Sequence, residues 1–244
     1  MPTLSLNGKS ALVTGGARRI GREIALELAR AGADLTITYQ SSQAEAAATV
    51  HSIQALGRRA QALQCDVRSE TSVREAVAGA ARFHARIDIL VNNAAIFQSV
   101  PLDQISLAQW DAVFETNARG PFLVAREALP HLRSSGGRII NMGSIGGMHP
   151  WATHAHYGAS KAALHMLTQA MAKAFAPQIT VNCVAPGWIE MDGSDPAEAA
   201  RFAAKTPLQR NGTAADIAEA VLYFATSAAF VTGQILGVDG GLGL

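Results

Sequence analysis

The strongest constraint on the fold of this chain is a regular alternation of short apolar segments with longer amphipathic ones. Short runs rich in Val, Ile and Thr predict strands, and apolar residues at helical spacing predict the helices between them. Ile20, Ile24 and Leu28 show the helical spacing, and Gly32 ends that segment. The predicted strands are Ser10–Thr14, Leu35–Tyr39, Ala60–Cys65, Ile87–Val91, Arg138–Met142, Ile179–Val184 and Gln234–Val238.

Helices are predicted between these strands. They are Ile20–Ala31, Ala44–Leu56, a helix from Ser69 or Thr71 to about Ala85, a long helix from about Leu107 to Leu132, Tyr157–Phe175 and Ala214–Ala225. Strict alternation implies parallel crossovers, so we expect an α/β protein with a Rossmann-type doubly wound parallel seven-stranded sheet. In such sheets ligands bind beyond the carboxyl ends of the strands.

Composition favours one compact domain spanning residues 1–244. The chain is 49% hydrophobic, and no linker or repeat divides it. Its net charge of +1 indicates neither nucleic acid nor a membrane surface as partner. Cys65 and Cys183 are too few for a disulfide framework. Because Met1 to Lys9 lack a signal-peptide pattern and no apolar run approaches about 20 residues, we expect a cytoplasmic protein.

A glycine-rich turn follows the first predicted strand. Glycines there permit a tight turn, and the following helix offers free N–H groups to a phosphate. The segment runs Thr14-Gly15-Gly16-Ala17-Arg18-Arg19-Ile20-Gly21. It resembles the TGxxxGxG loop of the short-chain dehydrogenases/reductases, and the resemblance extends over essentially the whole chain. Arg19 stands where that family usually has its middle glycine, as in pteridine reductases, where a similar arginine approaches phosphate and substrate.

The charge pattern after the second strand favours NADP(H) over NAD(H). NAD enzymes usually carry a carboxylate there to accept the ribose 2′-hydroxyl. This chain has Tyr39-Gln40-Ser41-Ser42, and its next acid is Glu45. Arg18 can meet a 2′-phosphate with paired hydrogen bonds, and Ser41 and Ser42 can donate to it. Equal efficiency with the two cofactors would contradict this expectation.

A tyrosine and a lysine four residues apart predict proton chemistry. Tyr157 and Lys161 share a helix face, and an ammonium favours the phenolate of a group whose ordinary pKa is about 10. That pair alone is a weak signal. Ser144 ends the fifth strand and Asn117 lies in the preceding long helix, and all four match the family's Asn-Ser-Tyr-Lys tetrad. The resemblance implies that Tyr157 is the general acid in reduction, that Ser144 binds the substrate oxygen, and that Asn117 positions a water.

Further strand-end segments match the family's cofactor site. Asp66-Val67 resembles its adenine-contacting pair, Asn92-Asn93-Ala94-Ala95 its NNAG segment, and Pro186-Gly187-Trp188-Ile189 the segment against the nicotinamide carboxamide. Ala95 replaces a glycine, and Met191 stands where the family often has threonine. The expected cofactor-binding residues are Gly15, Arg18, Arg19, Ile20, Gly21, Ser41, Ser42, Asp66, Val67, Asn93, Ala94, Tyr157, Lys161, Pro186, Gly187 and Ile189.

The substrate is less constrained than the cofactor. A polar segment at about 188–211 predicts a lid, and the expected pocket residues are Phe97, Ser144, His154 and Trp188. No cysteine or carboxylate accompanies the cluster of His149, His154 and His156 in sequence, so we expect no metal site.

Three functions stay open at this point. The first is a carbonyl reductase, with 3-oxoacyl thioesters as one substrate class. Acids in the lid (Glu190, Asp192, Asp195, Glu198) and Ser134-Ser135 in place of a basic pair argue against an acidic carrier protein. The second is a pteridine reductase, favoured by Arg19 and Phe97 and opposed by Ser144, where those enzymes carry aspartate. The third is a catalytically idle NADP(H)-binding sensor. The family is commonly a homotetramer, which the resemblance implies here.

Overall fold

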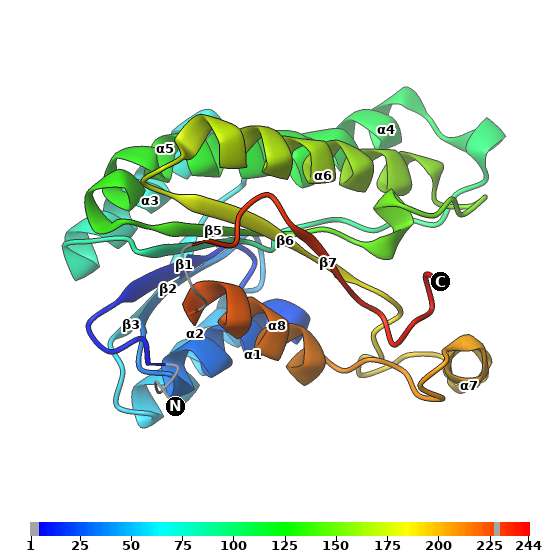
Figure 1. Ribbon diagram of the computed structural model, residues 1–244, viewed down its shortest axis with the longest axis horizontal. Helices are drawn as coiled ribbons and strands as arrows, with labels where there is room; N and C mark the ends of the chain where they lie inside the picture. The colour runs from blue at the N-terminus through cyan, green and yellow to red at the C-terminus, as the bar shows by residue number, and fades with distance from the viewer. Residues whose placement is uncertain (1–4, 227–229) are drawn as a thin grey trace.

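The sheet has the expected topology. The computed structural model describes residues 5–226 and 230–244, so part of the segment examined for a signal sequence, residues 1–4, lies outside them. All neighbouring strands are parallel, in the order β3-β2-β1-β4-β5-β6-β7 (Figure 1). The strands are β1 (Ser10–Val13), β2 (Asp34–Tyr39), β3 (Ala60–Gln64), β4 (Ile89–Asn92), β5 (Arg138–Met142), β6 (Thr180–Pro186) and β7 (Ile235–Val238). The Rossmann-type doubly wound sheet is therefore confirmed.

The strand order reverses beside β1. Val13 of β1 pairs with Ile37 of β2 on one side and with Val91 of β4 on the other. The chain leaves β1 towards one face of the sheet and β4 towards the opposite face. The loops that follow these two strands therefore diverge, and such a divergence creates the ligand-binding crevice of a doubly wound sheet.

Helices cover both faces of the sheet. One layer holds α1 (Arg19–Arg30), α2 (Gln43–Ala55) and α8 (Ala214–Thr226), and the other holds α3 (Glu70–His84), α4 (Leu107–Phe114), α5 (Gly120–Ser135) and α6 (Ala155–Phe175) (Figure 1). Side chains alternate along each strand, so Val13 packs into the first core and Leu12 into the second, both fully or almost fully buried. Within the described residues, no helix is long and apolar enough to cross a membrane.

The predicted long helix is interrupted. A π-helical turn, Glu115–Arg119, separates α4 from α5, so the expectation of one helix from Leu107 to Leu132 is wrong. Pro121 supplies a physical reason, because it has no N–H to donate to the carbonyl four residues earlier, that of Asn117. Such π turns often occur at functional sites, and this one carries the asparagine of the predicted tetrad.

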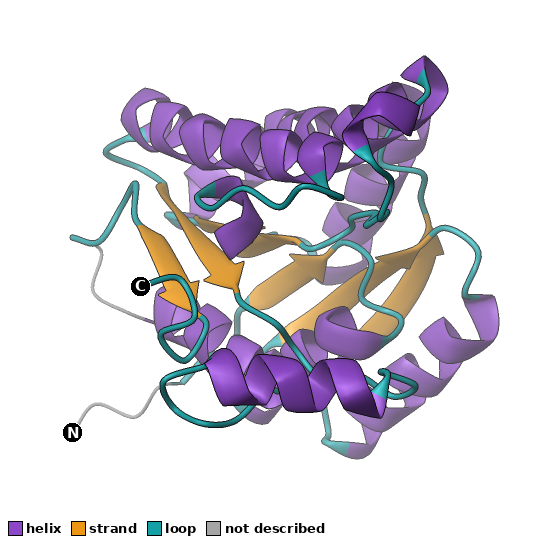
Figure 2. Ribbon diagram, turned by 90° about the vertical axis from the view of Figure 1, so that its right-hand side faces the viewer, coloured by secondary structure: helices purple, strands orange, loops and turns teal. Residues whose placement is uncertain are grey.

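The predicted irregular lid contains a helix. α7 (Pro196–Lys205) lies in the middle of residues 188–211, near the C-terminus and apart from both helix layers (Figures 1 and 2). Asp195 caps it by accepting a hydrogen bond from the Ala197 N–H at 3.0 Å. At its base, Ile189 forms an isolated parallel bridge with Gly212. The strand before the lid, β6, also runs two residues further than predicted, through Pro186.

Candidate active site

The loops after β1 and β4 are bonded to each other. The Thr14 hydroxyl oxygen accepts hydrogen bonds from the N–H groups of Asn93 and Ala94 at 3.0 and 3.1 Å. The Asn93 side chain donates to the carbonyl oxygens of Thr14 and Gly15, each at 3.0 Å. Gly15 has φ +63°, and a Cβ on Gly21 would collide with the Gly15 carbonyl oxygen. Glycine is therefore required at both positions for the turn to close against α1.

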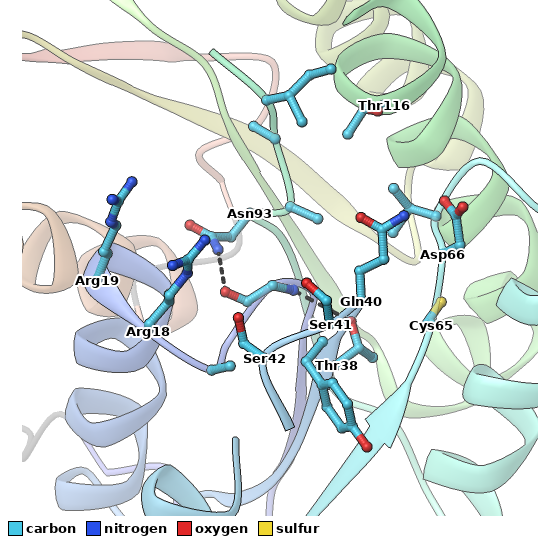
Figure 3. A pocket seen from close by; sticks show the side chains of 18 of the residues that line it. Arg18, Arg19, Thr38, Gln40, Ser41, Ser42, Cys65, Asp66, Asn93 and Thr116 are labelled. Atoms are coloured by element: carbon cyan, nitrogen blue, oxygen red, sulfur yellow. Dashed lines mark hydrogen bonds between the residues drawn. The ribbon is translucent and has the colours of Figure 1, made fainter. Parts of the chain in front are cut away.

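A cavity of about 450 Å3 lies over these loops (Figure 3). Asp66 is the acidic side chain among the described residues that line it, and its carboxylate pairs with Arg68 at 2.7 Å. Figure 3 shows Arg18 and Arg19 on the side opposite Asp66, with Ser41 and Ser42 between. Of the predicted cofactor residues, the cavity is lined by Gly15, Arg18, Arg19, Ile20, Gly21, Ser41, Ser42, Asp66, Val67, Asn93 and Ala94.

Asn117 connects two segments near the cavity. It is fully buried in the π-helical turn. Its side-chain oxygen accepts from the Ile96 N–H at 2.9 Å, and its amide nitrogen donates to the Ile96 carbonyl at 3.0 Å and to the Ser160 hydroxyl at 3.1 Å. The Ser160 hydroxyl donates to the Tyr157 carbonyl at 2.7 Å. Asn117 thus ties the loop after β4 to the helix that carries Tyr157.

Ser144, Tyr157 and Lys161 converge beside the end of β5. The Ser144 oxygen accepts from the Gly146 N–H at 3.0 Å and lies close enough to the phenol of Tyr157 to lower its pKa. Lys161 is almost fully buried, and its Nζ donates to the Met142 carbonyl at 2.7 Å. That Nζ lies 5.7 Å from the centre of the Tyr157 ring. The structure therefore brings together three of the four predicted catalytic residues. The fourth, Asn117, is connected to Tyr157 through Ser160.

Known families contain the same architecture. A family model described as "Enoyl-(Acyl carrier protein) reductase" matches residues 15–243. A solved short-chain dehydrogenase from Burkholderia cenocepacia J2315, in complex with NADP, superimposes with a TM-score of 0.93 at 41% identity, over 98% of this chain and 99% of that one. The chain belongs to the short-chain dehydrogenase/reductase family. The family assignment and its oxidoreductase class are thereby confirmed.

Relatives within the family differ in their named substrates. A 3-oxoacyl-[acyl-carrier-protein] reductase from Staphylococcus aureus is 38% identical over 240 residues, covering 96% of this chain and 98% of the relative. Versicolorin reductase 1 from Dothistroma septosporum is 39% identical over 257 residues, covering 97% and 96%. A blue fluorescent protein from a metagenomic library, solved with NADPH, has a TM-score of 0.93 at 39% identity, covering 98% and 99%. Because the chain is similarly identical to reductases with different names, these relatives do not single out one substrate for this dehydrogenase/reductase.

The departure from the family's glycine loop has a backbone consequence. Arg19 adopts φ +52°, in the left-handed region where glycine is unstrained. The chain therefore keeps the backbone conformation of the family's glycine while adding a guanidinium at the cavity wall. Neither Arg18 nor Arg19 forms an ion pair with another of residues 5–226 and 230–244. Both side chains retain their charge for a ligand.

Burial dominates the proton equilibria of the catalytic pair. It raises the pKa of Tyr157, and the contact with the Ser144 hydroxyl acts in the opposite direction. It lowers the pKa of Lys161 to about 8. The expectation was that the neighbouring ammonium would lower the pKa of Tyr157, whereas burial outweighs it in the structure. The ammonium lies several ångströms from the phenol ring and donates to Met142, whereas both groups are withdrawn from water.

Two aromatic groups flank the predicted substrate side. Phe97 stacks on His154 with ring centres 4.5 Å apart and meets Tyr157 edge-on at 4.9 Å. Phe97 is 58% exposed, so part of its ring is open to solvent next to these contacts. Trp188 instead stacks on Phe202 of the lid helix α7 at 5.3 Å. Phe97, His154 and Ser144 therefore gather around Tyr157, and Trp188 belongs to the lid.

The predicted residues after β6 lie beside the cavity without lining it. The Gly187 N–H donates to the Val238 carbonyl at 3.0 Å, and a Cβ on Gly187 would lie 2.6 Å from the Cβ of Asp239. Ile189 packs at the bridge with Gly212. Pro186, Gly187 and Ile189 therefore hold the base of the lid, and their predicted contact with the cofactor stays a prediction.

Several cavity residues were missed by sequence reasoning. The missed residues include Thr38, Gln40, Cys65, Arg68, Thr116 and Met191. Thr38 accepts a hydrogen bond from the Gly15 N–H at 3.3 Å, which braces the glycine turn. Its position at the end of β2 was a usable signal, because strand ends form the crevice. The sequence signal for Arg68 was weaker, since only the folded loop shows that its guanidinium pairs with the carboxylate of Asp66.

Proposed function

We propose that this chain is an NADPH-dependent reductase that converts a carbonyl group to an alcohol, with Tyr157 as general acid. One observation carries the proposal: the phenol of Tyr157, the hydroxyl of Ser144 and the buried ammonium of Lys161 converge beside a cavity with basic, uncommitted side chains. A proton donor and a hydrogen-bond donor that point to one place, next to a cavity suited to a dinucleotide, support hydride transfer to a polarised carbonyl.

The residues of the cavity fit NADP(H). Glycines 15 and 21 let a pyrophosphate approach the backbone at the N-terminus of α1. Arg18 and Arg19 can neutralise a 2′-phosphate, with the hydroxyls of Ser41 and Ser42 as further donors. Arg68 holds the pKa of the Asp66 carboxyl below its ordinary value, so the group stays a carboxylate, and the paired guanidinium of Arg68 balances its charge. Two solved relatives, one with NADP and one with NADPH, give independent support.

The proposed roles are those that the resemblance to the family's tetrad implies. When bound, NADPH supplies the hydride that adds to the carbonyl carbon. The Ser144 hydroxyl donates a hydrogen bond to the carbonyl oxygen, and Tyr157 transfers its proton to that oxygen, which completes the alcohol. Lys161 supplies positive charge behind the phenolate and holds the ribose. Asn117, bonded to Ser160 and Ile96, positions the water that returns a proton to Tyr157.

A pterin is the second candidate substrate. The exposed ring of Phe97 next to Tyr157 can contact a planar ring, and Arg19 extends from the cavity wall as in pteridine reductases. Ser144 in place of their aspartate argues for a ketone. Attachment of the substrate to an acidic carrier protein is disfavoured by the lid, although Glu198 pairs with Arg201 and Asp195 is engaged in capping α7.

A substrate panel tests the proposal. NADPH oxidation is followed with aliphatic and aryl ketones, diketones, 3-oxoacyl-CoA thioesters and dihydrobiopterin, each repeated with NADH. We expect turnover of a carbonyl substrate and a preference for NADPH. Turnover of dihydrobiopterin alone establishes the pterin function. Tight NADPH binding without any turnover revives the idle sensor and overturns the proposal.

We also propose the homotetramer that the family resemblance implies. Leu107, Trp110 and Phe122 are large apolar side chains left exposed on α4 and α5, 75%, 36% and 41% exposed, respectively. Large apolar side chains left exposed on neighbouring helices are typical of an interface between subunits. A monomeric mass by light scattering contradicts this assembly.

A further inference from the structure

We infer that His165 is a positioning residue, whose neutral imidazole accepts a hydrogen bond from the backbone N–H of Ser144 and so fixes the loop that presents the Ser144 hydroxyl to Tyr157. The inference rests on the proposed function, because it concerns the aim of that hydroxyl. Neither the tetrad nor the cofactor cavity includes His165.

His165 lies directly under the catalytic loop. It follows Lys161 by one helical turn, so both side chains leave the same face of α6. Its ring is 8% exposed, and its Nε2 lies 3.5 Å from the Ser144 nitrogen. The other contacts of Ser144 are the Gly146 N–H, which donates to its hydroxyl oxygen, the Gly147 N–H, which donates to its carbonyl oxygen at 3.0 Å, and the Tyr157 phenol. His165 is therefore the side chain that accepts from the backbone N–H of Ser144.

Two glycines make room for this ring. A Cβ on Gly143 would collide with His165 Nε2, and a Cβ on Gly147 would lie 2.7 Å from its Cε1. The imidazole therefore fills the space between the start and the end of the loop that carries Ser144. A ring held on two sides in this way can fix the loop only if its acceptor nitrogen faces the N–H, which is the arrangement in the structure.

Burial, together with one neighbouring positive charge, keeps the imidazole neutral. Burial and the nearby Lys161 ammonium lower the pKa of His165 to about 4. On β6, burial raises the pKa of the Cys183 thiol to about 12, so no thiolate offsets the ammonium. A protonated ring would turn an N–H towards the N–H of Ser144 and would place a second positive charge beside Lys161. Neutral His165, with its proton on Nδ1, is the form that accepts from Ser144.

The test compares two amides that differ in reach. In H165Q the side-chain oxygen stands where Nε2 does, because both are two bonds beyond Cγ. In H165N the amide ends at the position of Nδ1 and cannot reach Ser144. We expect H165Q to keep kcat within about 3-fold of wild type and H165N to lose about 10- to 100-fold, which corresponds to about 1.4 to 2.7 kcal/mol. The KM for NADPH should change less than about 2-fold in both. H51N on the exposed face of α2 is the matched control.

A second readout does not depend on turnover. Hydrogen exchange of the Ser144 amide, followed by mass spectrometry or NMR, should be slow in wild type and H165Q and fast in H165N. If H165N does not fold, H165L removes the acceptor while retaining apolar volume, and the same loss of kcat and protection is expected. Equal kcat and equal protection in the variants with and without an acceptor overturn the inference. Absence of turnover in wild type overturns the proposed function instead, and the exchange measurement still decides the role of His165.

Discussion

The cofactor side and the catalytic side of this site are built on opposite principles. Around the cavity, charged groups stay accessible: Arg18 and Arg19 extend into open space, and Asp66 is balanced by Arg68. Around Tyr157, titratable groups are withdrawn from water, and burial shifts the pKa values of Tyr157, Lys161 and His165. To bind a polyanion, a basic side chain must be accessible and able to exchange its water molecules for phosphate oxygens. Proton transfer instead needs groups whose pKa values the protein can tune.

The two sides are joined by uncharged hydrogen bonds. Thr14 and Asn93 tie the glycine turn to the loop after β4, and Asn117 ties that loop to α6. Amide and hydroxyl groups suit this task because their geometry does not change with pH. The comparison predicts that substitutions on the catalytic side alter turnover or acid stability, and that substitutions on the cofactor side alter affinity.

The largest expected effect is on the catalytic side. Tyr157→Phe removes the proposed general acid and should lower kcat by about 1000-fold or more, since general acid catalysis contributes up to about 10000-fold. The Kd for NADPH, measured by fluorescence titration, should stay within about 3-fold, because Tyr157 does not line the cavity among the described residues. Tyr223→Phe on the exposed part of α8 is the control. Retention of more than about a tenth of wild-type kcat contradicts the assignment.

Acid stability gives the next largest effect. The pKa of His165 is about 4 in the folded chain against an ordinary 6.5, so between these values the unfolded chain binds the proton more readily. The stability linked to this ring is complete above pH 6.5 and falls as the pH drops towards 4, by up to about 3 kcal/mol. Between pH 7 and pH 4.5, H165L should lose about 2 kcal/mol less unfolding free energy than wild type in urea titrations. Parallel losses in the two proteins would show that His165 is not the titrating group.

On the cofactor side, Arg18 should set the preference between cofactors. Arg18→Ala removes charge-assisted hydrogen bonds to a 2′-phosphate, each worth roughly 1.5 to 3 kcal/mol, and should raise the KM for NADPH by about 10- to 100-fold. The KM for NADH should change little. Arg22→Ala is a matched control, because Arg22 lies in the first turns of the helix that Arg18 precedes and contacts Ser52 outside the cavity. A loss of the same size with both cofactors would remove Arg18 from phosphate recognition.

The smallest effect concerns the strained backbone at Arg19. Its φ of +52° costs a side chain about 1 kcal/mol relative to glycine. Arg19→Gly should therefore raise the free energy of unfolding by about 1 kcal/mol and weaken NADPH binding several-fold. Arg19→Ala separates the two effects, since it loses the guanidinium and keeps the strain. A less stable Arg19→Gly protein would mean that Arg19 makes compensating contacts in the free chain.

Sequence periodicity predicted the sheet more accurately than the connections. All seven predicted strands are present within two residues of their predicted ends, because buried parallel strands are short apolar runs. The π-helical turn at Asn117 was missed, since it depends on the absent N–H of Pro121 rather than on apolar spacing. α7 was also missed, although Asp195, Pro196 and the alanines after them are a usual helix start.

The residues of the candidate site could be predicted from the sequence, but the pKa values of its titratable groups could not. Ser144, Tyr157 and Lys161 were identified by their match to the tetrad of the short-chain dehydrogenases/reductases, and the structure brings them together. The direction of the Tyr157 pKa shift was not available from sequence, because burial is a property of the whole fold. His165 was not singled out for the same reason: its role depends on the room left by Gly143 and Gly147.

The central claim is hydride transfer from NADPH to a carbonyl carbon under proton donation by Tyr157. The most direct measurement uses NADPH carrying deuterium at C4 of the nicotinamide, on either face in separate reactions, with the best substrate of the panel. The account predicts one deuterium on the carbinol carbon of the product with one of the two labelled cofactors, formed by the wild type and not by Tyr157→Phe. Product without deuterium from both cofactors, or labelled product formed equally well by Tyr157→Phe, would contradict it.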